Sequence, residues 1–140
     1  MAPPQLLIFV KAPTPGRVKT RCRPFLSPSQ AAELYRCLVR DTLRVVSELG
    51  SAVRPVVAYA ADESFPDLRW LDADVPTVLQ EGASLGERLA RAFDHAFAQG
   101  PMPVLALGSD APELTVDWIR EAVGASSRHE VVVGPTRDGG

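Results

Sequence analysis

The sequence predicts an α/β fold in which helices cover both faces of a mostly parallel sheet, giving three layers. Short apolar runs alternate along the chain with longer stretches that place apolar residues at helical spacing. Two of the runs, QLLIFV at residues 5–10 and PVLAL at residues 103–107, are continuously apolar apart from Gln5, as strands buried on both faces are. The 140 residues, 46% hydrophobic and 23% charged, suffice for a single globular domain spanning residues 1–140.

Five short strands are predicted. They are residues 5–10, 53–60, 76–80, 103–107 and 130–133. The first strand ends in a loop that contains Pro13, Pro15 and Gly16. Because strands alternate with helices, the crossovers should be right-handed, and the carboxyl ends of the parallel strands should lie at one edge of the sheet. Ligands bind at that edge in such folds.

Three helices are predicted between these strands, and each begins at a side chain that can cap it. The caps are Ser27, Ser84 and Thr115, with Gln30 and Glu87 completing capping boxes after the first two. The helices extend to Gly50, to Gly100 and to residues 122–123. Apolar residues at helical spacing between these limits predict a buried face on each helix.

The loop after the first predicted strand is basic. Its cations are Lys11, Arg17, Lys19, Arg21 and Arg23, and no acid precedes Glu33, so the first 32 residues carry a net charge of +5 and the remainder −7. Gly16 permits a tight turn with exposed amides, and the cations can neutralise a di- or triphosphate. The loop matches neither G-x-x-x-x-G-K-S/T nor G-x-G-x-x-G. A basic loop that is merely solvated is the alternative.

Two acids follow other predicted strands. Asp110 ends an apolar strand, where a carboxylate can hold a divalent cation that also bridges phosphate oxygens. A cap on the following turn is the alternative for Asp110. A metal site requires a partner for this single carboxylate, and Asp138 is the obvious second acid, although Asp-Gly at that point also indicates a turn.

A glycine-containing loop precedes the second predicted helix. Gly82 and Gly86 allow a ligand to approach the backbone closely, and the helix N-terminus offers free amides to an anion. The predicted capping box explains Ser84 and Glu87 without a ligand. Gly86 is harder to explain, because glycine in a first helical turn costs about 1 kcal/mol relative to alanine.

Several classes of function are excluded by the composition. The 15 basic and 17 acidic side chains nearly cancel, so there is no overall positive charge to hold nucleic acid. No apolar run approaches the length of a membrane span or a signal segment, which favours a soluble cytoplasmic protein. Cys22 and Cys37 have no metal-type spacing and are interpreted as free thiols. No serine–histidine–aspartate or zinc arrangement is found.

Four motifs taken together resemble one family. They are V-K-A-P-x-P-G-x-V-K-T-R, Q-x-G-x-x-L-G-E-R, G-S-D-A-P-x-L and G-P-x-x-D-G-G, in this order over residues 6–140. The sequence is similar to a bacterial family of unknown function that resembles nucleotide-diphosphosugar transferases. Its members are often named as arsenosugar-biosynthesis glycosyltransferases associated with radical-SAM proteins.

The resemblance implies a Rossmann-like GT-A fold and assigns roles to residues. Those implied to hold the nucleotide and its phosphates are Lys11, Ala12, Pro13, Gly16, Arg17, Lys19, Arg21, Gly82 and Arg88. By the same resemblance Asp110 binds Mg²⁺ or Mn²⁺, and Asp138 and Gly139 face the transferred sugar or assist the metal. Asp110 and Asp138 are the implied catalytic residues.

The sequence departs from the family in two ways. A typical D-x-D motif has a first acid, whereas Gly108 and Ser109 precede Asp110 here. The family also continues after D-G-G with an aromatic apolar strand and further helices, whereas this sequence ends at Gly140. We therefore expect the chain to be the N-terminal, nucleotide-binding part of the fold, incomplete at its C-terminus.

Three functions remain as alternatives. The first is a metal-dependent glycosyltransferase that binds a nucleotide-diphosphate sugar and transfers the sugar to a small acceptor. The second is a nucleotidyltransferase that joins a nucleoside triphosphate to a phosphorylated small molecule and releases pyrophosphate. The third is a truncated domain that binds nucleotide without turnover. Whether the chain forms a homodimer is left open.

Overall fold

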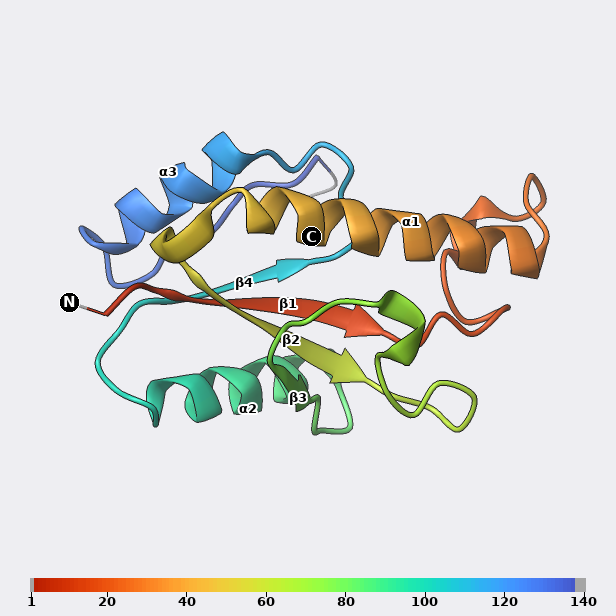
Figure 1. Cartoon of the computed structure of the whole chain (residues 1–140), viewed down its shortest axis with the longest axis horizontal. Helices are drawn as coiled ribbons and strands as arrows, with labels where there is room; N and C mark the ends of the chain where they lie inside the picture. The colour runs from red at the N-terminus through yellow and green to blue at the C-terminus, as the bar shows by residue number, and fades with distance from the viewer. Residues whose placement is uncertain (1, 138–140) are drawn as a thin grey trace.

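A computed structural model describes residues 2–137 as a parallel four-stranded sheet between two helical layers (Figure 1). The strands are β1 (Gln5–Lys11), β2 (Arg54–Ala60), β3 (Thr77–Leu79) and β4 (Val104–Gly108). The helices are α1 (Pro28–Ser47), α2 (Leu85–Phe97) and α3 (Val116–Ser126), with 3₁₀ turns at Thr20–Cys22, Gly50–Ala52 and Arg69–Leu71. Helices α1 and α3 cover one face of the sheet and α2 covers the other, as the alternation of elements predicts.

The strand order is β3-β2-β1-β4, so β1 lies in the interior of the sheet. The pairing of β1 with β2 continues to Lys11 opposite Ala60, whereas its pairing with β4 ends at Phe9 opposite Gly108. Beyond Phe9, therefore, β1 pairs on one side only. The carboxyl ends of β1 and β4 separate at this point, and the two chain segments that follow them diverge there.

The core confirms that the first strand is buried on both faces. Leu6, Ile8 and Val10 are 0–1% exposed and belong to the larger apolar cluster, which includes residues of α1. Leu7, on the opposite face, packs with Ala92 and Ala96 of α2. This arrangement fits a strand that has no polar alternation.

The predicted helix starts are confirmed. The Ser27 hydroxyl accepts from the Gln30 amide and the Gln30 side chain accepts from the Ser27 amide, forming the expected capping box. The Ser84 hydroxyl likewise accepts from the Glu87 amide. The Glu87 carboxylate, however, accepts from the amide of Ala83, one residue before the cap, so the second box lacks its reciprocal bond.

The predicted fifth strand is wrong for this structure. Within the described residues, 131–136 form no strand, and Val131 and Val133 are 80% and 81% exposed. A run of valines favours a strand only where a neighbouring strand supplies hydrogen-bond partners and packing. Here β4 is the edge of the sheet and does not pair with this segment. Asp138 and Gly139 lie outside the described residues.

Among residues 2–137, no helix has the length and apolar character needed to cross a membrane.

Candidate functional site

The basic loop after β1 is fixed to the body of the protein. Ala12 and Val18 are 6% and 1% exposed, and Pro13 is fully buried. The Ala12 amide donates to the Ala60 carbonyl at 2.9 Å, which prolongs the pairing with β2 by one residue. The loop is therefore a packed segment that presents its cations from a fixed backbone.

The tip of this loop is a type II turn. The Arg17 amide donates to the Thr14 carbonyl at 3.0 Å, with Pro15 and Gly16 at the two central positions. Gly16 has a φ of +86°, which the third residue of such a turn requires and which a residue with a side chain rarely adopts. The Pro-Gly sequence therefore determines the direction in which Arg17 leaves the loop.

Asp62 holds this turn, although the site residues expected from the sequence do not include it. One carboxylate oxygen accepts from the amides of Ser64 and Phe65 at 3.0 and 2.8 Å. The other accepts from the Thr14 hydroxyl and lies 3.9 Å from the Arg17 guanidinium. The Thr14 hydrogen bond is the main cause that lowers the pKa of Asp62. The position of Asp62 in the sequence indicates that it belongs to this edge, because it follows β2 and the carboxyl end of every parallel strand reaches the same edge.

The lowered pKa of Asp62 predicts a pH-dependent contribution to stability. A carboxyl group whose pKa is lower in the folded state stabilises the fold above its unfolded pKa, near 3.8, and loses that contribution as the pH falls through the folded value. Asp62→Asn should therefore be less stable than the parent protein at pH 7, and the difference should shrink below about pH 4. Urea unfolding at pH 7 and below about pH 4 measures the difference in free energy of unfolding between the two proteins. A difference that does not change with pH would contradict the prediction.

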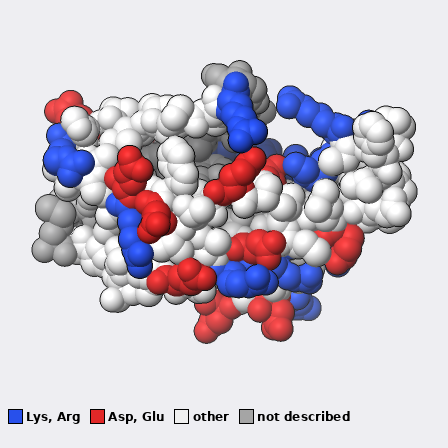
Figure 2. Space-filling view, turned by 90° about the horizontal axis from the view of Figure 1, so that it is seen from above, with Lys and Arg blue, Asp and Glu red and all other residues white. Residues whose placement is uncertain are grey.

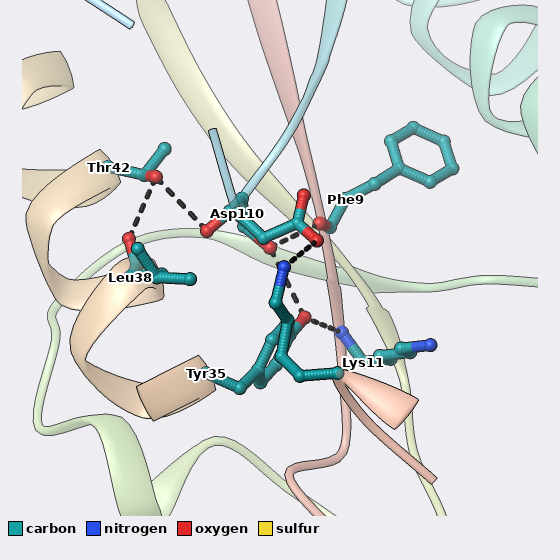
Figure 3. A network of polar contacts seen from close by, with 8 residues as sticks. Phe9, Lys11, Tyr35, Leu38, Thr42 and Asp110 are labelled. Atoms are coloured by element: carbon teal, nitrogen blue, oxygen red, sulfur yellow. Dashed lines mark hydrogen bonds and ion pairs between the residues drawn. The ribbon is translucent and has the colours of Figure 1, made fainter. Parts of the chain in front are cut away.

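Lys19 and Asp110 meet at the edge of the sheet, from loops that follow β1 and β4. The Lys19 ammonium lies 3.6 Å from a carboxylate oxygen of Asp110 (Figure 3). The Lys19 side chain is 26% exposed and that of Asp110 is 51% exposed, so the pair borders solvent. Lys19 adopts a left-handed backbone conformation, with a φ of 50°, immediately before the 3₁₀ turn at Thr20–Cys22. Such a conformation is uncommon for a residue with a side chain.

A chain of hydrogen bonds behind this pair occupies the point where β1 and β4 separate (Figure 3). The Lys11 amide donates to the Tyr35 hydroxyl at 2.9 Å, and the Tyr35 and Ser109 hydroxyls lie 3.2 Å apart. The Ser109 hydroxyl donates to the Phe9 carbonyl at 2.8 Å. Because a hydroxyl has one proton, Tyr35 is the donor to Ser109. Burial raises the pKa of Tyr35, which keeps it protonated for this role.

Thr42 of α1 completes the polar network. Its hydroxyl is 2.9 Å from the Leu38 carbonyl and 3.2 Å from the Ser109 carbonyl. Side chains of α1 therefore bond both the Lys11 amide and the Ser109 carbonyl, at the point where the ladder between β1 and β4 has ended. The site residues expected from the sequence do not include Tyr35, because nothing in its local sequence shows that its hydroxyl reaches the ends of two strands.

The loop before α2 reaches the same edge through Gln80. The Gln80 side-chain amide donates to the Val10 and Ala58 carbonyls at 3.3 and 2.8 Å, joining the end of β3 to β1 and β2. Gly82 has a φ of +138°, and a Cβ there would lie 2.8 Å from the Cβ of Glu87. The fold itself therefore requires this glycine.

Contacts within the fold explain why an arginine stands at position 88 but not why a glycine stands at position 86. The Arg88 guanidinium donates to the Gly82 carbonyl at 3.0 Å, which holds it against its own loop. A Cβ at Gly86 would meet no atom closer than the Ser84 hydroxyl at 3.9 Å. Steric crowding thus accounts for Gly82 and a hydrogen bond accounts for Arg88, whereas neither explains Gly86.

Positive charge gathers near this edge on the face that carries α1. Several Lys and Arg side chains border a hollow toward the end to which the strands point, and acidic side chains lie along one margin of it (Figure 2). Lys11, Arg17 and Arg21 are exposed. Such an arrangement raises the local concentration of anions.

The described residues fit one kind of cation site only. They contain no group of three or more histidine, cysteine, aspartate or glutamate side chains that could hold a metal ion. Asp110 offers a half-exposed carboxylate at the end of β4. Mg²⁺ and Mn²⁺ are often bound by one or two carboxylates together with substrate phosphates and water. The site thus fits a metal shared with a diphosphate and does not form a closed protein cage.

The structure brings together some of the predicted site residues. Lys19 and Asp110 are in contact, and Arg17 and Gly16 belong to the same fixed loop. Arg21 lies in the adjoining 3₁₀ turn, with an exposed side chain. Gly82 and Arg88 lie in the loop that precedes α2 and at the start of that helix.

Comparison with solved structures finds a close structural relative. It is a protein from Desulfovibrio desulfuricans G20 that is provisionally named a nucleotide-diphospho-sugar transferase, solved at 1.90 Å resolution. The two share 32% sequence identity with a TM-score of 0.89, over 99% of this chain and 61% of that protein. The chain therefore spans about three fifths of the length of that relative, and its four-stranded parallel sheet is consistent with a GT-A-like fold.

No curated protein matches the chain. Residues 42–140 match the family described as "Uncharacterized protein conserved in bacteria (DUF2064)". The match covers most of the chain but begins after the basic loop, which is covered by the structural similarity. The chain belongs to the DUF2064 family.

Proposed function

We propose that this protein binds a nucleotide-diphosphate sugar at the carboxyl edge of its sheet and transfers the sugar to a small acceptor with the help of a divalent cation. The observation that carries the proposal is the contact between Lys19 and Asp110 at 3.6 Å. It unites, at one point, a cation suited to a diphosphate and a carboxylate suited to a metal. The name of the structural relative supports the same class of substrate.

The basic loop would bind the diphosphate. Arg17, Lys19 and Arg21 supply positive charge from a backbone that is held by buried residues and by Asp62. Cations placed in advance stabilise the negative charge that develops on a leaving diphosphate and need no rearrangement when it forms. Lys11, Ala12, Pro13 and Gly16 shape this loop, and Gly82 and Arg88 would border the nucleotide from the α2 side.

The network behind Asp110 would keep the carboxylate in place. Ser109 is bonded to β1 and to α1 through its hydroxyl and its carbonyl, so the next residue leaves β4 in a fixed direction. A bound Mg²⁺ or Mn²⁺ would supply further positive charge beside the diphosphate. Asp138 and Gly139 are proposed to lie on the sugar side of the site.

Asp110→Asn tests the metal component. In the parent protein we expect Mn²⁺ to tighten the binding of a nucleoside diphosphate about tenfold, a coupling typical of linked sites. The amide retains the size of the side chain but removes its charge, so the enhancement should fall below about twofold. Calorimetric titration of UDP, GDP and ADP with and without Mn²⁺ measures it. If parent and variant show the same enhancement, Asp110 is only a cap on the following turn.

The reaction itself is tested through its products. Incubation with nucleotide-diphosphate sugars and a panel of small acceptors should release a nucleoside diphosphate together with a glycosylated acceptor. A nucleotidyltransferase would instead consume a nucleoside triphosphate and release pyrophosphate. Binding of nucleotide with neither product would support the binding-only alternative, so the three functions give different results in the same assay.

A further inference from the structure

The three cations proposed for the diphosphate differ in their contacts. Arg17 lies 3.9 Å from Asp62, which is held by two backbone amides and by Thr14. Arg21 is exposed, and the ion pairs that involve the described residues do not include it. Lys19 alone of the three reaches Asp110, the carboxylate proposed for the metal. Its side chain is also far less exposed than that of Arg17, 26% against 74%.

From this contact we propose that Lys19 and the divalent cation compete for Asp110, and that a bound diphosphate removes the competition by drawing the Lys19 ammonium to its own oxygens. The proposal rests on the proposed function and adds a coupling to it: a bound diphosphate strengthens metal binding at Asp110, and a bound metal strengthens diphosphate binding by the same factor. An ammonium group is a compact charge with three donors on a flexible stem, so it can exchange one anionic partner for another.

The geometry around Lys19 supports an exchange of partners by its side chain. The backbone is set by the turn that begins there, in which the Cys22 amide donates to the Lys19 carbonyl at 3.0 Å. The neighbouring Val18 is 1% exposed and anchors the loop. Only the side chain is therefore free to change partners. On the other side, Ser109 is bonded through its hydroxyl and its carbonyl, which fixes the base of Asp110.

The first test uses Mn²⁺ alone, in the absence of nucleotide. Lys19→Met keeps an unbranched side chain of similar length but removes the ammonium, so Mn²⁺ should bind about fivefold more tightly than to the parent, the upper range for an exposed ion pair. Arg21→Met removes the same charge from the same loop without touching Asp110, and at 0.15 M salt it should change the affinity less than about twofold. Electron paramagnetic resonance of free Mn²⁺ measures all three proteins.

The outcomes of this test are decisive. Equal Mn²⁺ affinity in Lys19→Met and the parent overturns the competition, and so does an absence of Mn²⁺ binding in both. An equal gain in Lys19→Met and Arg21→Met also overturns it, because the effect would then come from the net charge of the loop. Circular dichroism establishes that the variants remain folded.

The second test separates this inference from the proposed function. UDP, GDP and ADP are titrated into each protein with and without Mn²⁺. Lys19→Met should bind the accepted nucleotide more weakly, and the Mn²⁺ enhancement should fall from about tenfold to about twofold, since the metal no longer depends on removal of the ammonium. If none of the three nucleotides binds the parent protein, the proposed function fails, while the Mn²⁺ titration alone still decides the competition for Asp110.

Discussion

Replacement of Lys19 and Arg21 together by alanine is expected to weaken the binding of a nucleoside diphosphate about 100-fold. Each side chain is proposed to donate a charge-assisted hydrogen bond to a phosphate oxygen, and such bonds contribute about 1.5 kcal/mol each at the lower end of their range. The lower figure applies because Lys19 borders solvent and Arg21 is exposed. Isothermal titration calorimetry at fixed ionic strength measures the change.

A charge-matched variant provides the control for this prediction. Arg44 and Arg120 lie on α1 and α3 and pair with acids one helical turn earlier, Asp41 and Asp117. Arg44→Ala with Arg120→Ala removes the same two charges from the molecule and should change nucleotide affinity less than about threefold. Similar losses in both double variants would show that overall charge, not the loop, determines binding. Unchanged affinity in the loop variant would remove the basis for a phosphate site there.

The second large effect is expected on stability. Tyr35→Phe should lower the free energy of unfolding by about 2 kcal/mol, the typical cost of leaving a buried donor without its acceptor. Tyr35 is 3% exposed, and its hydroxyl is the acceptor for the Lys11 amide and the donor to Ser109. Because phenylalanine fills the same space, the decrease in the free energy of unfolding would come from the lost hydrogen bonds and not from a cavity. Equilibrium unfolding in urea measures it.

Ser47→Ala is the matched hydroxyl deletion for this measurement. Ser47 lies on the same helix, is exposed and donates to the Arg44 carbonyl at 2.6 Å. Because water replaces that bond, the variant should remain within about 0.5 kcal/mol of the parent. A Tyr35→Phe variant as stable as Ser47→Ala would mean that the strand ends find other partners when the hydroxyl is lost.

The elements that the sequence predicts well are those set by local pattern. β1 and β4 are recognised because each contains an unbroken apolar run, at residues 6–10 and 103–107, and α1 because Ser27 and Gln30 form a capping box at its start. The valine run at residues 131–133 shows the limit of such reasoning. Its composition favours a strand, but pairing depends on a neighbour that the local sequence does not specify.

The candidate site shows the same division between local and distant information. The basic loop and Asp110 are visible in the sequence because each follows a strand that is recognisable by itself. The bond from Thr14 to Asp62 spans 48 residues, and that between Tyr35 and Ser109 spans 74. None of these four residues is unusual in its local sequence. Only the packing of α1 and β2 against β1 shows that these residues position the site.

The anchoring of the basic loop has a consequence for the thermodynamics of binding. A disordered loop must lose conformational entropy when it closes on a ligand, and that loss subtracts from affinity. Here the backbone that carries Arg17 and Lys19 is already ordered by the buried residues Ala12 and Val18 and by its hydrogen bond to β2. The folding of the domain has met this entropic cost in advance, so binding needs to order only the cationic side chains and the ligand itself.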